Sequence, residues 1–229
     1  MRHLAVALAL AACAPVGFRD AEWRGEPIEE GRLQWRVRDG RGHGPGLGAW
    51  SARHVRPRDG GFELRLRRGV GAEISAALPL GALDVDLTLE SLDAPFEALG
   101  PEVVVGAFVY RHDTSEADLE IARWGDRRSA NGQLVVAAGP FRPPRAIVRF
   151  PLEGPRVEAA LRWRGGRLAW RVTDGQRPLR WSARGPRNAG HRLHVNVWAR
   201  RPGAGEARIW VRARARASAS MEPWPTSGT

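Results

Sequence analysis

The sequence predicts an all-β fold, either a β-sandwich or a barrel. Many short segments alternate apolar and polar residues with a period of two, and helical signals are nearly absent. The 27 glycines and 17 prolines fall mostly between the alternating segments, as turn residues should. Many short antiparallel strands in one domain are typical of both architectures, and a jelly roll fits the length of residues 31–217.

The N-terminal half of this domain contains three alternating segments. In each one the apolar residues occupy every second position, so one face is expected to pack into a core. Residues 91–99 follow these segments and are compatible with one turn of helix. The apolar positions are Leu33, Trp35 and Val37 in the first segment, Phe62, Leu64 and Leu66 in the second, and Leu83, Val85, Leu87 and Leu89 in the third.

The clearest hairpin surrounds Gly165 and Gly166, because a two-residue glycine turn sets the register of the strands on either side. This register pairs Trp163 with Leu168 on an apolar face. A last strand is predicted over residues 209–216, before a small, polar tail at residues 218–229. We interpret the arginines of both segments as solvated strand faces rather than nucleic-acid tracts; they are Arg162, Arg164, Arg167, Arg171, Arg212, Arg214 and Arg216.

The composition narrows the function classes. All 36 basic residues are arginine, against 25 acidic residues, which gives a net charge of +11. The complete absence of lysine indicates a coding bias toward arginine, so the basic excess is weak evidence for a nucleic-acid partner. One cysteine excludes a disulfide framework and a cysteine-cluster metal site. No apolar run reaches the length of about 18 residues that a membrane-spanning helix needs.

The N-terminus is typical of an export signal, with a short basic start and an apolar stretch over residues 4–10. Its end, Leu-Ala-Ala-Cys at residues 10–13, resembles the lipobox of bacterial lipoproteins. That resemblance implies removal of residues 1–12, acylation of Cys13, a linker up to residue 30 and, with Ala14 next, the outer membrane of the cell envelope. A chance cysteine in a signal cut elsewhere is the alternative. An exported location argues against nucleic acid as a partner.

The segment with candidate catalytic residues is a predicted strand at residues 115–121. Glu116, Asp118 and Glu120 share one face of it, and apolar side chains occupy the other. Because like charges on one strand face repel, we expect another part of the structure to compensate. Retaining glycoside hydrolysis needs two carboxyl groups about 5–5.5 Å apart, one as nucleophile and one as acid. A solvated carboxylate face balanced by nearby arginine is the alternative.

This segment resembles the Glu-x-Asp-x-Glu signature of family-16 glycoside hydrolases, the laminarinase and lichenase group. The similarity covers roughly residues 31–214, and it departs from the pattern at Ala117 and Leu119, where isoleucine is commoner. The supporting segments are AEISAALPLGALDVDLTLESLD and EVVVGAFVY upstream, and RWG, LRWRGGRLAWRV and HVNVW downstream.

The resemblance implies a two-sheet antiparallel β-sandwich, a concanavalin A-like jelly roll. It implies that Glu116 is the nucleophile, Glu120 the acid/base and Asp118 their helper. It also implies that Trp198 stacks on a sugar ring and Asn196 hydrogen-bonds it, with Trp124 as a further substrate contact. No cofactor is implied, although a structural calcium stays open. We expect no other metal site, because His191 and His194 lie three apart on a strand and face opposite ways.

These observations predict an exported, lipid-anchored glycosidase or transglycosylase that acts on a β-linked polysaccharide with retention. The polysaccharide is the expected partner, the membrane is reached through Cys13, and we expect a monomer. Two alternatives stay open. One is a lectin-like lipoprotein that binds glycans without cleaving them. The other is a structural envelope lipoprotein whose arginine-rich strand faces contact anionic lipid or lipopolysaccharide phosphates.

Overall fold

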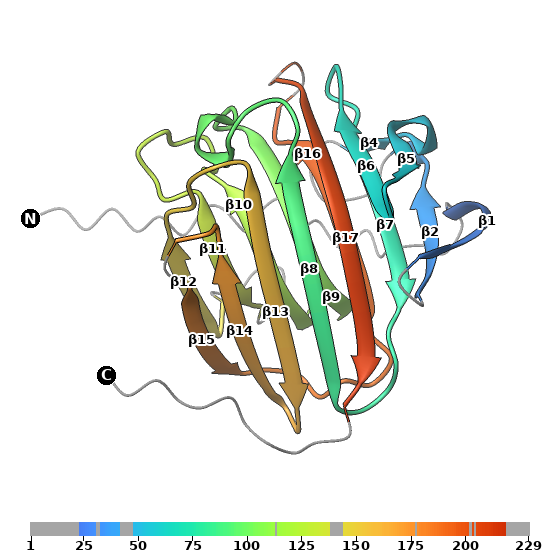
Figure 1. Cartoon of the computed structure of the whole chain (residues 1–229), viewed down its shortest axis with the longest axis vertical. Helices are drawn as coiled ribbons and strands as arrows, with labels where there is room; N and C mark the ends of the chain where they lie inside the picture. Colours follow the sequence, from blue (N-terminus) through green and yellow to red (C-terminus); the bar gives the residue numbers. More distant parts are fainter. Residues whose placement is uncertain are drawn as a thin grey trace, which may run out of the picture.

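The computed structural model describes residues 23–30, 33–41, 48–112, 114–137, 144–176, 178–201, 203 and 205–218. The predicted signal at residues 1–12, the lipidation site Cys13 and most of the predicted tail lie outside the described residues. Two antiparallel sheets face each other, and in Figure 1 the seven-stranded sheet lies in front of the eight-stranded one. The prediction of an all-β two-sheet sandwich is confirmed.

The eight-stranded sheet carries the predicted carboxylate segment. Its spatial order is β1-β2-β7-β16-β9-β10-β11-β12, so β10 has hydrogen-bonded neighbours on both sides. The strands are β1 (Trp23–Glu30), β2 (Leu33–Arg38), β7 (Ala72–Ala77), β16 (Arg192–Ala199), β9 (Val103–His112), β10 (Ser115–Ala122), β11 (Gly132–Val136) and β12 (Ala146–Phe150).

The seven-stranded sheet contains the predicted glycine hairpin and the last strand. Its order is β15-β14-β13-β8-β17-β6-β5, and β3 (Gly40–Arg41) pairs separately with β4 (Ala49–Trp50). The strands are β15 (Leu179–Arg184), β14 (Arg167–Thr173), β13 (Arg156–Arg164), β8 (Leu83–Ser91), β17 (Ala207–Ala217), β6 (Gly61–Leu66) and β5 (Val55–Arg58). Two short 3₁₀ helices, η2 (Ala52–His54) and η3 (Phe96–Ala98), complete the described elements, and η3 falls inside the predicted helical turn.

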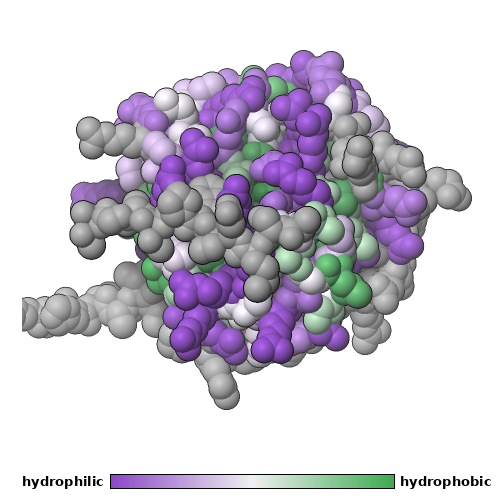
Figure 2. All heavy atoms as spheres, turned by 60° about the horizontal axis from the view of Figure 1, so that its bottom comes forward, coloured by the Kyte–Doolittle hydropathy of each residue, from purple (hydrophilic) through white to green (hydrophobic). Residues whose placement is uncertain are grey.

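The core lies between the two sheets and consists of the alternating apolar residues that the sequence indicated. Trp35, Trp163 and Trp170 are each 1% exposed within it. Among the described residues the large apolar side chains with much exposed surface are Leu80 and Ile147. The surface seen in Figure 2 is accordingly mostly hydrophilic, with small apolar patches. Within the described residues, no helix is long and apolar enough to cross a membrane.

The glycine hairpin has the predicted register. Trp163 pairs with Leu168 across β13 and β14, and Arg164 pairs with Arg167 next to the turn. Both turn glycines have positive φ, 52° at Gly165 and 81° at Gly166. A side chain would strain these conformations, which explains why glycine occupies both positions.

Candidate active site

The three predicted carboxylates lie on the outer face of β10. The residues between them, Ala117 and Leu119, face the core and have no exposed surface. Asp118 is 8% exposed, and Glu116 and Glu120 are half-buried. The row therefore has the orientation that the strand pattern predicted, and it is more buried than a solvated carboxylate face would be.

Cross-strand neighbours define the surroundings of Glu120. Gln133 of β11 faces it on one side and Gly106 of β9 on the other. The Gln133 amide donates a short hydrogen bond to Oε2 of Glu120. Gly106 has no side chain, and the side chain of Asn196, which pairs with Gly106 from β16, fills the space beside it. A Cβ atom at residue 106 would lie 2.8 Å from Oδ1 of Asn196.

Burial decides the protonation of the row. It raises the pKa of Glu120 from 4.5 to about 7, against the opposing effects of the Gln133 hydrogen bond and the charge of Arg149. Burial also raises the pKa of Asp118 well above its usual value, and the charges of Glu116 and Glu120 raise it further. A hydrogen bond joins Asp118 to Glu116, which requires a proton on one of the two carboxyls. Retained protons, Gln133 and Arg149 thus supply the compensation that the row needs.

Three buried polar atoms in or beside the row make no hydrogen bond among the described residues. Asn196 is 1% exposed, and neither its amide nitrogen nor its amide oxygen makes a hydrogen bond. Oδ1 of Asp118 is also without a partner. Buried polar atoms are normally satisfied by protein, water or ligand. Each of these atoms therefore has capacity for a hydrogen bond that a water molecule or a ligand hydroxyl would fill.

A buried ionic network beside the row was not predicted from the sequence. Nη1 of Arg38 lies 2.8 Å from Oε2 of Glu73, and Nδ1 of His194 lies 2.8 Å from Oε1 of the same carboxylate. Burial alone would raise the pKa of Glu73, but the His194 hydrogen bond and the Arg38 charge hold it below its usual value. Burial lowers the pKa of His194, so a neutral ring donates its Nδ1 hydrogen to Glu73.

This network reaches the carboxylate row through one aromatic ring. The His194 ring stacks on Phe108, with centroids 4.9 Å apart and planes 11° apart. In the register of the sheet, Phe108 lies between His194 and Asp118. No local motif signals these contacts, because β2, β7 and β16 are far apart in the sequence. The network links β2, β7 and β16 on the outer face of the sheet, beside the row.

The two predicted tryptophan contacts differ in exposure. Trp198 is 7% exposed and packs in a cluster with Trp50, Val104 and Ala122. Trp124 is half-buried and meets Trp198 edge to face at 6.2 Å between centroids. Trp124 has a φ of 54°, an unusual conformation for a bulky residue, and its carbonyl accepts a short hydrogen bond from Arg200. The Trp198 ring offers little free surface for a sugar, whereas Trp124 offers more.

The two histidines face opposite sides, as predicted. His191 lies on the core side, edge to face with Trp163 at 4.5 Å and 2.7 Å from Oγ of Ser115. His194 lies on the outer face of the eight-stranded sheet, in the network described above. The residues that the structure describes contain no group of three or more His, Cys, Asp or Glu side chains that could hold a metal ion.

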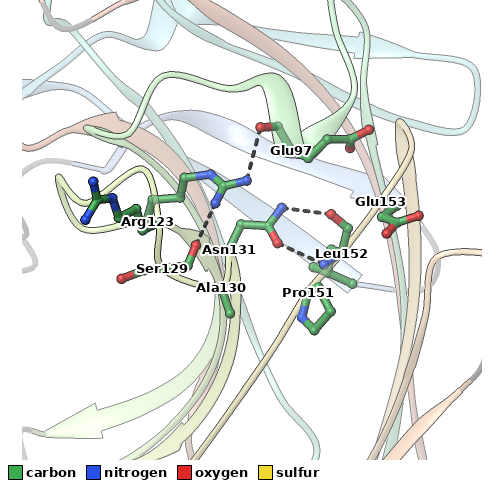
Figure 3. Close-up of a pocket in the computed structure, with 9 residues that line it drawn as sticks. Glu97, Arg123, Ser129, Ala130, Asn131, Pro151, Leu152 and Glu153 are labelled. Carbon is green, nitrogen blue, oxygen red and sulfur yellow. Dashed lines mark hydrogen bonds between the residues drawn. The ribbon is translucent and has the colours of Figure 1, made fainter.

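A separate cavity of about 480 Å³ lies where the β10–β11 and β12–β13 loops meet η3 (Figure 3). Arg123 supports one side of it by donating to the carbonyl oxygens of Ser129, at 2.6 Å, and Glu97, at 3.2 Å. The Asn131 side chain closes another side through two hydrogen bonds to the backbone of Leu152, at 2.9 and 2.8 Å. None of the three carboxylates of β10 lines this cavity, so it is distinct from the carboxylate row.

Comparison with known proteins places the fold. No family model and no curated protein sequence matches the chain. A prokaryotic β-1,3-1,4-glucanase (lichenase) derived from a mouse hindgut metagenome matches with a TM-score of 0.58 and 17% identity, over 83% of this chain and 97% of that one. Bacillus licheniformis β-glucanase matches with a TM-score of 0.58 and 15% identity, over 87% and 100% of the two chains.

A third solved structure has the same fold but is not described as an active glucanase. It is described as an immunostimulatory antigen and pseudo β-1,3-glucanase of Mycobacterium tuberculosis. It matches with a TM-score of 0.59 and 14% identity, over 85% of this chain and 100% of that one. At these identities the likeness establishes a shared fold with β-glucanases and leaves the activity to be argued from the site.

Proposed function

We propose that this protein is a retaining glycoside hydrolase or transglycosylase of the family-16 type that acts on a β-linked polysaccharide. One observation carries the proposal: three carboxyls share the outer face of β10, and the pKa of Glu120 is raised to about 7. A carboxyl that keeps its proton near neutral pH is what protonation of a glycosidic oxygen requires. The shared fold with β-glucanases supports the same assignment.

The proposed reaction has two displacements. In the first, the Glu116 carboxylate attacks the anomeric carbon while Glu120 gives its proton to the glycosidic oxygen. The bond between that carbon and oxygen breaks, and a glycosyl ester of Glu116 remains. In the second, Glu120 takes a proton from a water molecule or a sugar hydroxyl. The oxygen of that group attacks the anomeric carbon, and the bond between this carbon and Glu116 breaks. The configuration at the anomeric carbon is retained.

The other residues have supporting roles in this proposal. Protonated Asp118 donates a hydrogen bond to Glu116, which keeps the nucleophile ionised. Gln133 orients the Glu120 carboxyl through its amide. Asn196 keeps its role as a hydrogen-bonding partner of the sugar, which requires a movement that exposes its two unsatisfied amide atoms, because the residue is 1% exposed. Trp124 is the more open aromatic contact. Trp198 is 7% exposed, so its proposed contact with a sugar is limited to the exposed part of its ring.

The test is a reducing-sugar assay of the full-length chain against β-1,3-1,4-glucan, laminarin, agar and carrageenan. Glu116→Gln and Glu120→Gln should each nearly abolish turnover while thermal unfolding stays cooperative. Glu158→Gln is the matched control, because that carboxylate is 57% exposed on the other sheet. Full activity in either site variant would show that the row is not catalytic.

A second candidate function is glycan binding without cleavage. The likeness to a structure described as a pseudo β-1,3-glucanase favours this function, because that protein has the same fold and is not described as an active glucanase. Affinity electrophoresis in gels containing each polysaccharide separates the two functions. Retardation with no product from any substrate supports a binding module, and product formation that depends on Glu116 rejects it.

We further propose that the protein is held in the bacterial envelope by acyl chains on Cys13, the one cysteine of the chain. The expected result is that Cys13→Ser moves the protein from the membrane pellet to the soluble fraction after a high-salt wash. Equal retention of both forms in the pellet after that wash would reject the lipid anchor.

A further inference from the structure

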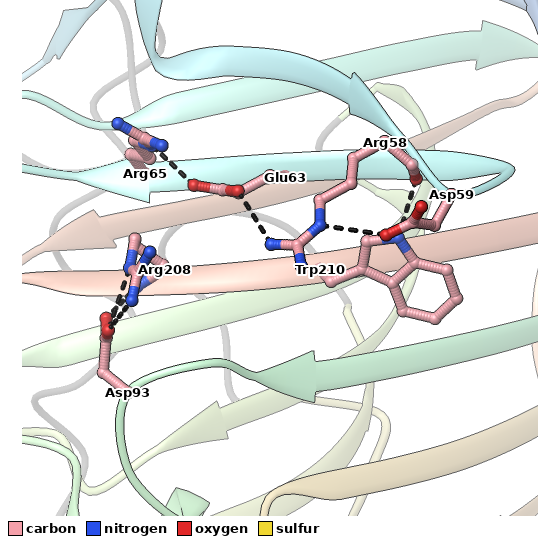
Figure 4. A network of polar contacts seen from close by, with 7 residues as sticks. All are labelled: Arg58, Asp59, Glu63, Arg65, Asp93, Arg208 and Trp210. Atoms are coloured by element: carbon pink, nitrogen blue, oxygen red, sulfur yellow. Dashed lines mark hydrogen bonds and ion pairs between the residues drawn. The ribbon is translucent and has the colours of Figure 1, made fainter.

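The outer face of the seven-stranded sheet divides into two regions of different charge. Toward β6 and β17 several of its arginines are paired with neighbouring carboxylates. Arg65 lies 2.6 Å from Glu63, and Arg208 lies 2.5 Å from Asp93. Figure 4 shows this network, in which Glu63 of β6, Asp59 of the β5–β6 turn and Asp93 after β8 each point at a guanidinium. The central strands contain further pairs, Arg164–Asp84 at 2.6 Å and Arg216–Asp86 at 3.3 Å. Among the described residues, Arg212 and Arg214 of β17 have no carboxylate within ion-pair distance.

Toward β14 and β15 the pattern changes. Neither strand contains an acidic residue, and both present arginine on the outer face. Leu168, Trp170 and Val172 point inward, so the alternating arginines point outward. We name this region the arginine edge; it consists of Arg167, Arg171, Arg180 and Arg184, which are all exposed.

The register places like charges directly opposite each other in the arginine edge. Arg167 pairs with Arg184, and Arg171 pairs with Arg180. Like charges in directly opposed positions destabilise a sheet. Among the described residues, no carboxylate lies within ion-pair distance of Arg167, Arg171 or Arg184. Arginines also oppose each other elsewhere on this sheet, as Arg65 and Arg208 do, but there each one has a carboxylate partner.

A surface with multiple anionic groups would relieve this repulsion. Guanidinium groups bind phosphate oxygens in pairs, and several of them at fixed spacing favour a partner with many phosphates. The position of the arginine edge on the molecule distinguishes between possible partners. The arginine edge lies on the opposite outer face of the sandwich from β10, so a polysaccharide bound there would not reach the carboxylate row. A flat anionic surface bound there would leave the row open to solvent.

We propose that the arginine edge docks this protein on an anionic phospholipid surface, with the carboxylate row facing away from the lipid. This inference does not depend on catalysis, because it rests on the seven-stranded sheet alone. It also differs from lipid anchoring, since it needs no acyl chain.

The experiment is vesicle flotation of the full-length chain carrying Cys13→Ser, so that no acyl chain contributes. The vesicles contain phosphatidylcholine with about 30 mol% phosphatidylglycerol, or phosphatidylcholine alone. The edge variant carries glutamine in place of Arg167, Arg171, Arg180 and Arg184. The control variant carries glutamine in place of Arg58, Arg156, Arg208 and Arg216, which are 46–67% exposed and already ion-paired. Both variants lose the same charge.

Wild-type protein and the control variant should float with the anionic vesicles and not with the neutral ones. The edge variant should bind more weakly by about fivefold for each arginine removed. Binding should also fall steeply between about 50 and about 500 mM salt. Hydrolysis of a soluble glucan, where present, should be the same in all three proteins.

Three outcomes would overturn the proposal. One is the absence of wild-type binding to anionic vesicles, and another is equal loss in the edge and control variants. The third is displacement from the vesicles by soluble polygalacturonate that binds the edge more tightly than the lipid does. That result would assign the edge to an acidic polysaccharide instead. Thermal unfolding of both variants confirms that the losses do not come from unfolding.

Discussion

Replacing Glu120 by glutamine should change how the free energy of unfolding depends on pH. Burial raises the pKa of this carboxyl from 4.5 to about 7, against the Gln133 hydrogen bond and the charge of Arg149. Between these two values the folded chain keeps a proton on Glu120 that the unfolded chain has released. The folded state binds more protons there, so its stability must fall as the pH rises.

The size of the effect follows from the pKa difference. Below pH 4.5 both states are protonated and the group contributes no pH dependence. Above it the loss grows by about 1.4 kcal/mol for each pH unit, to about 2 kcal/mol at pH 6 and about 3 kcal/mol at pH 8. A glutamine side chain in place of Glu120 cannot titrate, so the variant escapes this loss. It also lacks the Glu120 charge that raises the pKa of Asp118, which acts in the same direction.

Wild-type stability alone would hide the effect, because His191 titrates in the same range with the opposite sign. Burial lowers the pKa of His191 from 6.5 to about 4, so its contribution is present above 6.5 and is lost as the pH falls toward 4. The measurement is therefore the difference in unfolding free energy between wild type and Glu120→Gln, from urea titrations at several pH values. His191 cancels in that difference.

The expected result is that Glu120→Gln gains about 3 kcal/mol on wild type between about pH 4.5 and about pH 8. Glu158→Gln is the control, because it removes a carboxylate that is 57% exposed. A difference that stays constant with pH, or that moves in favour of wild type as the pH rises, would refute the reasoning about burial of the row.

Three further substitutions test the surroundings of the row. Gly106→Ala should cost about 1–3 kcal/mol in urea unfolding, because its Cβ would lie 2.8 Å from Oδ1 of Asn196; an unchanged midpoint would show that the amide moves freely. Glu73→Gln should cost about 3–5 kcal/mol, because it leaves a buried guanidinium without its carboxylate; a smaller loss would mean that water replaces it. Trp198→Ala should lower stability by about 3–5 kcal/mol and Trp124→Ala by less, as measured by calorimetry; the reverse order would contradict their burial.

The fold could be predicted because its signals are local. Period-two alternation identifies a strand and its buried face from a few neighbouring residues, as at Leu33–Val37. The glycine pair at residues 165–166 gave the register of a whole hairpin, since a two-residue turn leaves few alternatives. The outward direction of Glu116, Asp118 and Glu120 followed in the same way from the apolar residues between them.

The surroundings of the row could not be predicted, because they depend on pairing between distant segments. Glu73 and His194 are 121 residues apart, and the network also needs Arg38 from a third strand. Nothing local to any of the three indicates the others. The burial of Trp198 has the same origin, since Trp50 and Val104 of its cluster come from other parts of the chain. Exposure of an aromatic ring on a strand depends on these distant neighbours.

Each outer face of the sandwich contains a region in which like charges lie close together. On the eight-stranded sheet it is the carboxylate row, which retained protons and Gln133 partly relieve. On the seven-stranded sheet it is the arginine edge, where Arg167 lies opposite Arg184 and Arg171 opposite Arg180. Each region lowers the stability of the isolated chain, and a ligand of suitable chemistry would remove that penalty. A sugar hydroxyl network fits the first and a phosphate surface fits the second. The two proposals together predict that a polysaccharide and an anionic lipid surface bind at the same time, one on each side of the sandwich.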